Sequence, residues 1–275
     1  MDADALFDEA AAALRAARVA EARELFGRAG AAGRHDAAVI HCNLTASSGD
    51  WAGGARLLAE LARTDARCRR QFELICAMDL SASLRGEVVS EAPHLTLFPC
   101  LFTGEECRYL IEAATPMLAP AVVVDPATGA QRRDPLRVSD SAGFTLPLEN
   151  PAVHALNQRI AAASATGWAQ GEPLQVLRYA PGGEYKPHFD AIPGFANQRI
   201  LTMIVWLNEG YDGGETLFTK TGAKLKGRTG DALLFRNALP DGRRDPDSGH
   251  AGLPVTAGEK LIASRWIRAR PFALA

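Results

Sequence analysis

The first 80 residues carry the hydrophobic periodicity of α-helices. Apolar residues recur there every three or four positions, the spacing of one helix face, and glycine-containing breaks at 30–33 and 49–54 divide the pattern. The apolar positions are Leu6, Ala10, Ala13 and Leu14; Ala22, Leu25, Phe26 and Ala29; Ala38, Val39 and Cys42; and Ala55, Leu58 and Leu61. Short amphipathic helices must stack to bury these faces, so we predict a small all-α domain over residues 1–80.

After residue 80 the sequence no longer shows continuous helical periodicity. Residues 81–92 read as a linker, and the strand-like LTLFP that follows leads to Thr103-Gly-Glu-Glu106, which has the capping-box pattern of a helix start. Asp50 likewise reads as the cap of an earlier helix. From residue 173 onward we predict strands, divided by Gly, Pro and Asp turns: PLQVLRY, RILTMIVWLN, ETLF, DALLFRN and KLIASRWIRA. Strands of this kind and spacing indicate a barrel or sandwich, and the whole chain an α+β protein.

Three polar segments interrupt the C-terminal part: residues 124–137, 191–198 and 238–249. Long polar loops around the mouth of an enzyme often close when a ligand binds. Each segment is therefore either a lid or a plain surface connection, and the sequence leaves both interpretations open.

Candidate chemistry is concentrated in two of the C-terminal segments. His188 and Asp190 form a His-x-Asp pair, and residues two apart on a strand point to the same face. His250, far downstream, supplies a third ligand from another element. Two imidazoles and one carboxylate are the ligand set of a mononuclear non-haem Fe(II) site with open positions. A 2-oxo acid and O2 would take those open positions.

Lys260 follows His250 by ten residues, on a strand-like run. The distal carboxylate of 2-oxoglutarate is costly to bury without a paired cation, and this lysine is its natural partner. Zinc hydrolysis by the same triad is the alternative, although the sequence has no HExxH helix and the lysine would then be unexplained. The other histidines lack ligand partners at suitable spacing: His35, His41, His94 and His154.

The C-terminal half resembles the Fe(II)/2-oxoglutarate dioxygenases of the prolyl 4-hydroxylase type. The matching runs are LQVLRYAPGGEYKPHFD, RILTMIVWLNEGYDGGETLF, GDALLFRN and HAGLPVTAGEKLIASRWIR, with weaker matches at FTGEECRYLIEAA and RVS. The resemblance covers residues 93–270 and implies a double-stranded β-helix (jelly-roll) core, so we expect the dioxygenase domain over residues 93–275. The N-terminal part loosely resembles helical pairs of the tetratricopeptide kind, and a plain helical cap on the core is the alternative.

The resemblance implies a role for several residues. It makes His188, Asp190 and His250 both the metal ligands and the catalytic residues. Lys260, Tyr179 and Thr202 would then bind 2-oxoglutarate, and Trp266 would contact substrate. Apart from the resemblance, four arginines are either selectors of an acidic substrate, with Arg199 as the substrate-binding candidate, or solvated residues of strand edges: Arg178, Arg199, Arg265 and Arg268. Departures from the family pattern are Trp206, where tyrosine is usual, and Asn208-Glu209 in place of Asn-Asp; these leave target preference open.

Composition limits the remaining possibilities. The chain has 275 residues, a net charge of −2 and 47% apolar residues, so it is an ordinary globular protein without a basic surface for nucleic acid. Five scattered cysteines without a CxxC indicate reduced thiols in a cytoplasm. The N-terminus lacks a signal-peptide pattern and no apolar run reaches membrane-spanning length, so we expect no membrane partner.

These features together predict an Fe(II)- and 2-oxoglutarate-dependent hydroxylase that uses O2, with ascorbate as a reductant. The resemblance favours a prolyl residue of a protein or peptide as the target, recruited by the N-terminal helices, over a free amino acid or other small molecule. The rival from another class is a catalytically idle, iron- or 2-oxo-acid-sensing interaction protein.

Overall fold

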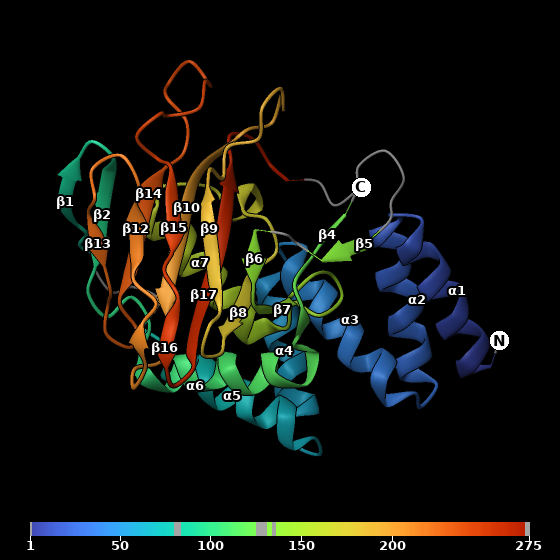
Figure 1. Ribbon diagram of the computed structural model, residues 1–275. Helices are drawn as coiled ribbons and strands as arrows, with labels where there is room; N and C mark the ends of the chain where they lie inside the picture. The colour runs from blue at the N-terminus through green and yellow to red at the C-terminus, as the bar shows by residue number, and fades with distance from the viewer. Residues whose placement is uncertain (1, 80–83, 125–130, 134–135, 273–275) are drawn as a thin grey trace. The chain divides into compact units, whose positions relative to one another are not determined.

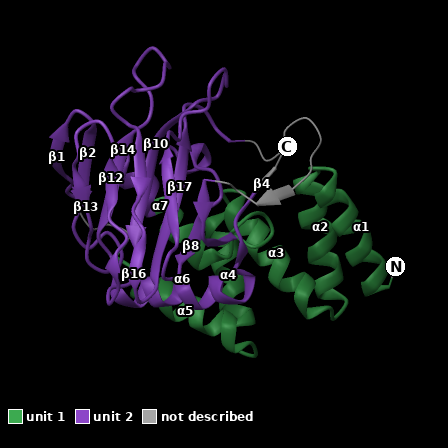
Figure 2. Cartoon of the chain, viewed as in Figure 1, with its two compact units in different colours: residues 1–82, 144–158, 273–275 green, residues 83–143, 159–272 purple. Residues whose placement is uncertain are grey.

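The computed structural model describes residues 2–79, 84–124, 131–133 and 136–272. These residues form two compact units (Figure 2). The first takes in the described residues of 1–82 together with 144–158, and the second takes in those of 83–143 together with 159–272. The first unit is therefore built from two separate stretches of the chain.

The first unit contains five consecutive helices, of which the first four contain the apolar positions given by the sequence pattern. They are α1 (Ala3–Arg15), α2 (Val19–Ala31), α3 (His35–Ser47), α4 (Trp51–Leu61) and α5 (Ala66–Ala77). The apolar faces of α1, α2 and α3 meet in a cluster that includes Leu6, Ala10, Ala22 and Phe26. A second cluster joins Cys42 of α3 to Leu58 of α4 and Cys68 of α5. The expected cap at Asp50 is confirmed, because its side chain accepts a hydrogen bond from the Gly53 amide. Among the described residues, no helix is both long and apolar enough to cross a bilayer.

Residues 144–158 pack with these helices although they lie far away in the sequence. The carbonyl of Pro147 accepts a hydrogen bond from Asn43 Nδ2 at 2.9 Å. Leu146 packs against the apolar cluster of the first unit, and the His154 ring stacks on Trp51 with centroids 6.0 Å apart. Helix α7 (Pro151–Ala163) begins in this stretch and ends in the second unit. The N-terminal helices thus bind a segment from the middle of the chain.

The second unit is dominated by two antiparallel sheets (Figure 1). The larger has the order β1-β2-β14-β10-β17-β8-β7-β3 and the smaller β13-β12-β15-β9-β6. The strands of the larger sheet are β1 (Glu87–Glu91), β2 (His94–Phe98), β3 (Ala119–Pro120), β7 (Asp140–Gly143), β8 (Gln175–Tyr179), β10 (Arg199–Trp206), β14 (Ala232–Arg236) and β17 (Lys260–Arg268). Those of the smaller are β6 (Arg137–Val138), β9 (Glu184–His188), β12 (Thr216–Phe218), β13 (Lys224–Leu225) and β15 (His250–Gly252).

The remaining elements of this unit are short. Two further pairs are β4 (Val122–Val124) with β5 (Gln131–Arg133), and β11 (Asp212–Gly213) with β16 (Val255–Ala257). The helical elements are α6 (Gly104–Ala114) and the 3₁₀ turns η1 (Thr115–Met117) and η2 (Trp168–Gln170). The predicted capping box is confirmed: the Glu106 amide donates to Thr103 Oγ1, and the Thr103 amide donates to the Glu106 carboxylate.

The two sheets share one apolar core. Ile204 and Trp206 of β10 belong to it, as does Phe218 of β12, whereas Met203 and Val205, at the alternate positions of β10, are buried but are not part of this cluster. Successive side chains of a strand point to opposite faces, and both faces of β10 are buried. The sequence RILTMIVW is therefore a nearly continuous apolar run. The predicted α+β architecture is confirmed.

Two segments differ from their expected description. Residues 87–91, within the expected linker, form the edge strand β1, paired to β2. The polar segment 124–137 contains β5, while residues 125–130 and 134–135 lie outside the described part of the chain, as do residues 80–83 of the linker.

Removal of residues 1–83 tests the part played by residues 144–158. This deletion removes the helices that bind Leu146 and Pro147. The apolar surface of residues 144–158 that these helices cover then becomes exposed to water. We expect the shortened chain to aggregate, or to unfold at a temperature lower by ~10 °C or more. Differential scanning calorimetry together with gel filtration measures both effects. A monomer that unfolds cooperatively at the temperature of the full chain would contradict this expectation.

Candidate active site

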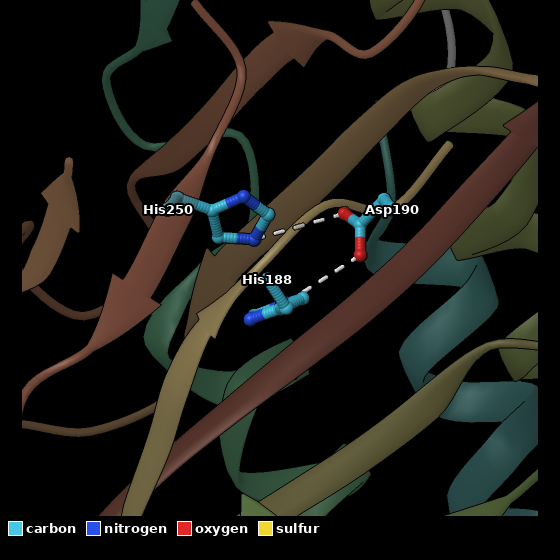
Figure 3. Close-up of side chains that lie close together, drawn as sticks. All are labelled: His188, Asp190 and His250. Atoms are coloured by element: carbon cyan, nitrogen blue, oxygen red, sulfur yellow. Dashed lines mark ion pairs between the residues drawn. The ribbon is translucent and has the colours of Figure 1, made fainter. Parts of the chain in front are cut away.

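Two of the three expected ligands lie on neighbouring strands of the smaller sheet, and the third follows one of these strands in the chain. His188 is the last residue of β9 and His250 the first of β15, and they are direct partners in the antiparallel pairing of these strands. Asp190 does not lie on the strand, contrary to the simple alternation argument. It occupies the bend that follows β9 and turns its carboxylate back toward both imidazoles (Figure 3).

The three side chains form a compact, buried group. One ligand atom from each lies within 4.8 Å of the others. Asp190 Oδ1 is 3.6 Å from His188 Nε2, and Oδ2 is 3.8 Å from His250 Nε2. The side chains are only 8%, 4% and 6% exposed for His188, Asp190 and His250. Three ligand atoms therefore converge on one point that is largely screened from solvent.

Hydrogen bonds on the far side of each imidazole fix its tautomer. His188 Nδ1 lies 2.8 Å from the Lys186 carbonyl, and His250 Nδ1 lies 2.9 Å from the Ser248 carbonyl. A carbonyl only accepts, so each Nδ1 carries the hydrogen and each Nε2 presents a lone pair to the centre. Burial, followed by the nearby His250, lowers the pKa of His188 to about 4. At neutral pH this ring is therefore ready to bind a cation.

The carboxylate of Asp190 is held in its ionised form. Burial alone would raise its pKa, but the two histidines and a hydrogen bond from Thr202 outweigh burial and hold the pKa below its usual value. Two neutral imidazoles and one carboxylate are the donor set that non-haem Fe(II) takes. The residues present therefore fit an Fe(II) ion, with Nε2 of both histidines and Asp190 as its ligands.

A buried polar chain fixes the orientation of this carboxylate. Thr202 Oγ1 donates to Asp190 Oδ2 at 2.6 Å, and Asn237 Nδ2 donates to Thr202 Oγ1 at 2.7 Å. Thr202 and Asn237 are 1% and 0% exposed. Thr202 was expected to bind the co-substrate, whereas in the structure its hydroxyl proton is directed at the carboxylate.

Lys260 lies in the same cavity as the three ligands, together with Tyr179. It is the register partner of Tyr179 between β17 and β8, and its Nζ donates to the Gly214 carbonyl at 2.6 Å. Gly213 and Gly214 both have positive φ angles, near 69° and 68°, so this turn favours glycine at both positions. Burial lowers the pKa of Lys260 to about 8, so near neutral pH the cavity contains a cation away from the triad.

Trp266 lines this cavity and stands opposite Thr202 in the pairing of β10 with β17. The Arg199 guanidinium lies 3.6 Å from the centroid of its ring. Both Arg199 Nε and its terminal nitrogen donate to Glu172, at 2.6 and 2.8 Å, and Arg268 also lies against that carboxylate. Arg199 therefore forms an ion pair with Glu172, and this pair holds its guanidinium against the Trp266 ring.

Sequence reasoning missed several residues of this cavity. Tyr185 stacks on His188 with centroids 3.5 Å apart, and Arg137 of β6 lies across from Tyr185 and also lines the cavity. Glu172 and Asn237 complete the buried network. Tyr185 stands three residues before His188 in the matching run LQVLRYAPGGEYKPHFD and could have been found there. Nothing local distinguishes Asn237 from a strand end or Glu172 from a surface acid.

Comparison with known proteins agrees with this geometry. Residues 174–268 match the 2OG-Fe(II) oxygenase superfamily. Prolyl 4-hydroxylase 1 of Arabidopsis thaliana is 35% identical over 205 residues, covering 68% of this chain and 72% of that protein. Prolyl 4-hydroxylase subunit alpha-1 of Gallus gallus is 33% identical over 190 residues, covering 66% and 36% respectively.

Among solved structures, the viral collagen prolyl hydroxylase of Paramecium bursaria Chlorella virus-1, in complex with 2OG, is similar with a TM-score of 0.52. It is 30% identical, and the match covers 66% of this chain and 99% of that one. This chain belongs to the prolyl 4-hydroxylase family of 2OG-Fe(II) oxygenases. It is a 2-oxoglutarate-dependent dioxygenase whose cofactor is Fe(II) and whose co-substrates are 2-oxoglutarate and O2.

Replacement of Thr202 by valine tests the polar chain behind Asp190. The substitution keeps the shape but removes the hydroxyl, so Asp190 loses a donor and the buried Asn237 amide loses its acceptor. We expect a loss of about 10-fold or more in Fe(II) affinity, as is usual when a partner of a ligand is removed. Thr216→Val is the matched control: Thr216 lines the same cavity but, among the described residues, its hydroxyl is not hydrogen-bonded to a metal ligand, as that of Thr202 is. The metal affinity of both variants is measured by titration with Co(II), whose absorption changes on binding. Equal affinities of Thr202→Val and Thr216→Val would refute the role assigned to Thr202.

Proposed function

We propose that this protein hydroxylates prolyl residues of a protein or peptide, with the conversion of 2-oxoglutarate and O2 to succinate and CO2. The observation that supports this most directly is a single cavity lined by His188, Asp190 and His250 together with the buried cation Lys260. A metal triad alone would fit several chemistries, whereas the cation beside it suits a co-substrate with a second carboxylate.

Each residue of the cavity has a distinct part in this proposal. His188, Asp190 and His250 would hold the Fe(II) ion in the cavity that they line. Bound Fe(II) and 2-oxoglutarate supply the oxidative chemistry, in which one oxygen atom of O2 enters a substrate C–H bond and the other enters succinate. The protein contributes ligation, a fixed orientation of the co-substrate and exclusion of water.

Lys260 is the proposed partner of the distal carboxylate of 2-oxoglutarate. Its Nζ is directed at the Gly214 carbonyl in the described structure and retains donors for a second acceptor. Tyr179 lies beside it, with the Lys260 Nζ 5.4 Å from the centre of its ring. Trp266, supported by Arg199, is the proposed contact for the target residue at the edge of the cavity.

The substrate class follows from the relatives. The proteins named above are prolyl 4-hydroxylases, one of them a collagen prolyl hydroxylase, and these names support a prolyl target. We further propose that the N-terminal helices recruit a protein target and that ascorbate serves as the reductant. All five cysteines are free, and Cys76 and Cys100 are exposed, which supports a reducing, cytoplasmic location.

The proposed activity is tested with purified Fe(II)-loaded protein, 2-oxoglutarate and proline-containing peptides. We expect succinate together with a peptide that is heavier by one oxygen atom, detected by mass spectrometry. His188→Ala and His250→Ala should lose Fe(II) binding and turnover while they keep the native circular dichroism spectrum, because two remaining ligands hold the ion poorly against water. His94→Ala, which alters a half-buried histidine of β2 outside the cavity, should behave as the parent. Normal turnover in either ligand variant would rule out the assignment of the triad.

Substitution Lys260→Met keeps much of the aliphatic stem and removes the charge. A desolvated carboxylate without its partner costs about 2–5 kcal/mol, so the affinity for 2-oxoglutarate should fall roughly tenfold or more. Fe(II) affinity should stay unchanged, and Lys224→Met, on the exposed strand β13, should leave both affinities unchanged. Anaerobic calorimetric titration gives both values. If the affinity of Lys260→Met for 2-oxoglutarate is unaltered, another cation must bind the distal carboxylate.

The pKa of Lys260 also predicts a pH dependence. Burial lowers it to about 8, and a bound carboxylate would favour the protonated amine. The affinity for 2-oxoglutarate should therefore be nearly constant below pH 8, and should fall above it toward about tenfold per pH unit, because binding then requires uptake of a proton. In Lys260→Met this dependence should disappear. A parent protein whose affinity is unchanged between pH 7 and pH 10 would contradict the expectation.

A further inference from the structure

A second hollow lies outside the cavity of the metal triad. It has a volume of about 980 Å³ and is bordered by two of the loops that were expected to be lids or connections, 191–198 and 238–249. One loop begins directly after Asp190 and the other ends directly before His250. Both rise from the same end of the sheets in Figure 1. We call this hollow the loop groove.

The walls of the loop groove are largely apolar, with cations among them. Its apolar side chains are Pro193, Phe195, Ile200, Leu201, Leu239 and Pro240. Phe195 is 55% exposed, which is unusual for a ring of this size in a soluble protein. The charged side chains of the lining are three arginines, Arg236, Arg243 and Arg244, and one carboxylate, Asp241.

Two of these arginines already have carboxylate partners. Arg236 Nε lies 3.2 Å from buried Asp245, and Arg243 Nε lies 2.7 Å from Asp241. Arg244 differs: among the described residues its guanidinium forms neither an ion pair nor a hydrogen bond, and it lies 4.0 Å from the centre of the Phe189 ring. The loop groove therefore contains one exposed cation whose charge is not compensated.

The aromatic ring under Arg244 belongs to the chain segment that carries two of the metal ligands. The ring on which it stacks, Phe189, is the residue between His188 and Asp190. Gly249, next to His250, lies against the same ring, since a side chain at that position would meet Phe189 at 3.0 Å. Stacking on an aromatic ring reduces the number of positions that an arginine takes. A peptide residue a few positions from the target would therefore come within reach of a cation in a defined place.

The four arginines nominated from sequence are occupied differently. Arg178 pairs with Asp140, and Arg199 and Arg268 lie against Glu172. Arg265 donates to the backbone carbonyls of Glu172 and Trp168. Selection of an acidic substrate by these side chains would require ion pairs or buried hydrogen bonds to break, whereas Arg244 needs no such rearrangement.

We propose that the loop groove binds the stretch of the substrate polypeptide that flanks the target residue, and that Arg244 pairs with an Asp or Glu of this stretch. The proposal rests on the proposed function, because it assigns sequence preference to that same reaction. Apolar walls suit an extended segment with small or apolar side chains, and the single uncompensated cation favours one carboxylate. Arg244 thereby becomes a specificity-determining residue that has no part in the chemistry.

The test uses synthetic peptides with a central proline in a Gly/Ser/Ala background. Each carries one Glu at one of the three positions before or after the proline, and a matched set carries Gln instead. For the parent protein we expect at least one Glu peptide to have a KM about threefold to fivefold below that of its Gln partner, the upper part of the range for an exposed ion pair, with kcat unchanged. The advantage should shrink at high salt.

Arg244→Gln should abolish this difference and Arg243→Gln should preserve it, because Arg243 is already paired with Asp241. Thermal unfolding checks that both variants fold. The proposal is overturned if no Glu peptide is preferred, if the preference survives Arg244→Gln, or if Arg243→Gln removes it equally.

Fluorescence anisotropy with labelled peptides gives a second, turnover-independent readout. If a Glu peptide binds in an Arg244-dependent way but no peptide is hydroxylated, the loop groove is supported and only the proposed function is contradicted. Hydroxylation without any effect of Arg244 on binding would support the proposed function and overturn the assignment of the loop groove.

Discussion

The pairing of His188 with His250 across β9 and β15 is the constraint on which the site depends. In an antiparallel sheet, a slip of one residue would turn every side chain of a strand to the other face. This register instead places both imidazoles on the inner face, where aromatic rings enclose His250: the Phe235 and Phe218 centroids lie 4.8 and 5.9 Å from its own. The bend after β9 can then deliver Asp190 to the same point.

Buried charge is the second requirement that the second unit has to meet. An isolated ion inside a low-dielectric interior is strongly unfavourable, so buried charges occur with partners. Asp190 accepts from Thr202, Lys260 donates to a backbone carbonyl, and Glu172 is bound by Arg199. These contacts hold the polar groups in place before any ligand arrives, which is the kind of preorganisation that catalysis needs.

The two units also show that proximity in sequence does not decide which residues fold together. Residues 144–158 are separated from the N-terminal helices by the first strands of the larger sheet, yet their contacts through Asn43 and Trp51 are with those helices. Helix α7 then continues the chain into the second unit. An α-helix is held by local hydrogen bonds, so one helix can begin in one unit and end in the other.

The sequence by itself determined the features that are local or periodic. Apolar spacing predicted α1 to α4, the Thr103 and Glu106 pattern predicted a capping box, and β-branched and apolar runs predicted strands such as β10 and β17. The His-x-Asp pair, the distant His250 and Lys260 were readable because their residue types and order match a chemistry. Only the tertiary structure decided what depends on contacts between distant segments: that Thr202 is hydrogen-bonded to Asp190 and Asn237, that Arg199 is neutralised by Glu172, and that Arg244 is left without a carboxylate. A side chain's partner is set by sheet register and packing, and these are properties of the whole fold, which no short stretch of sequence encodes.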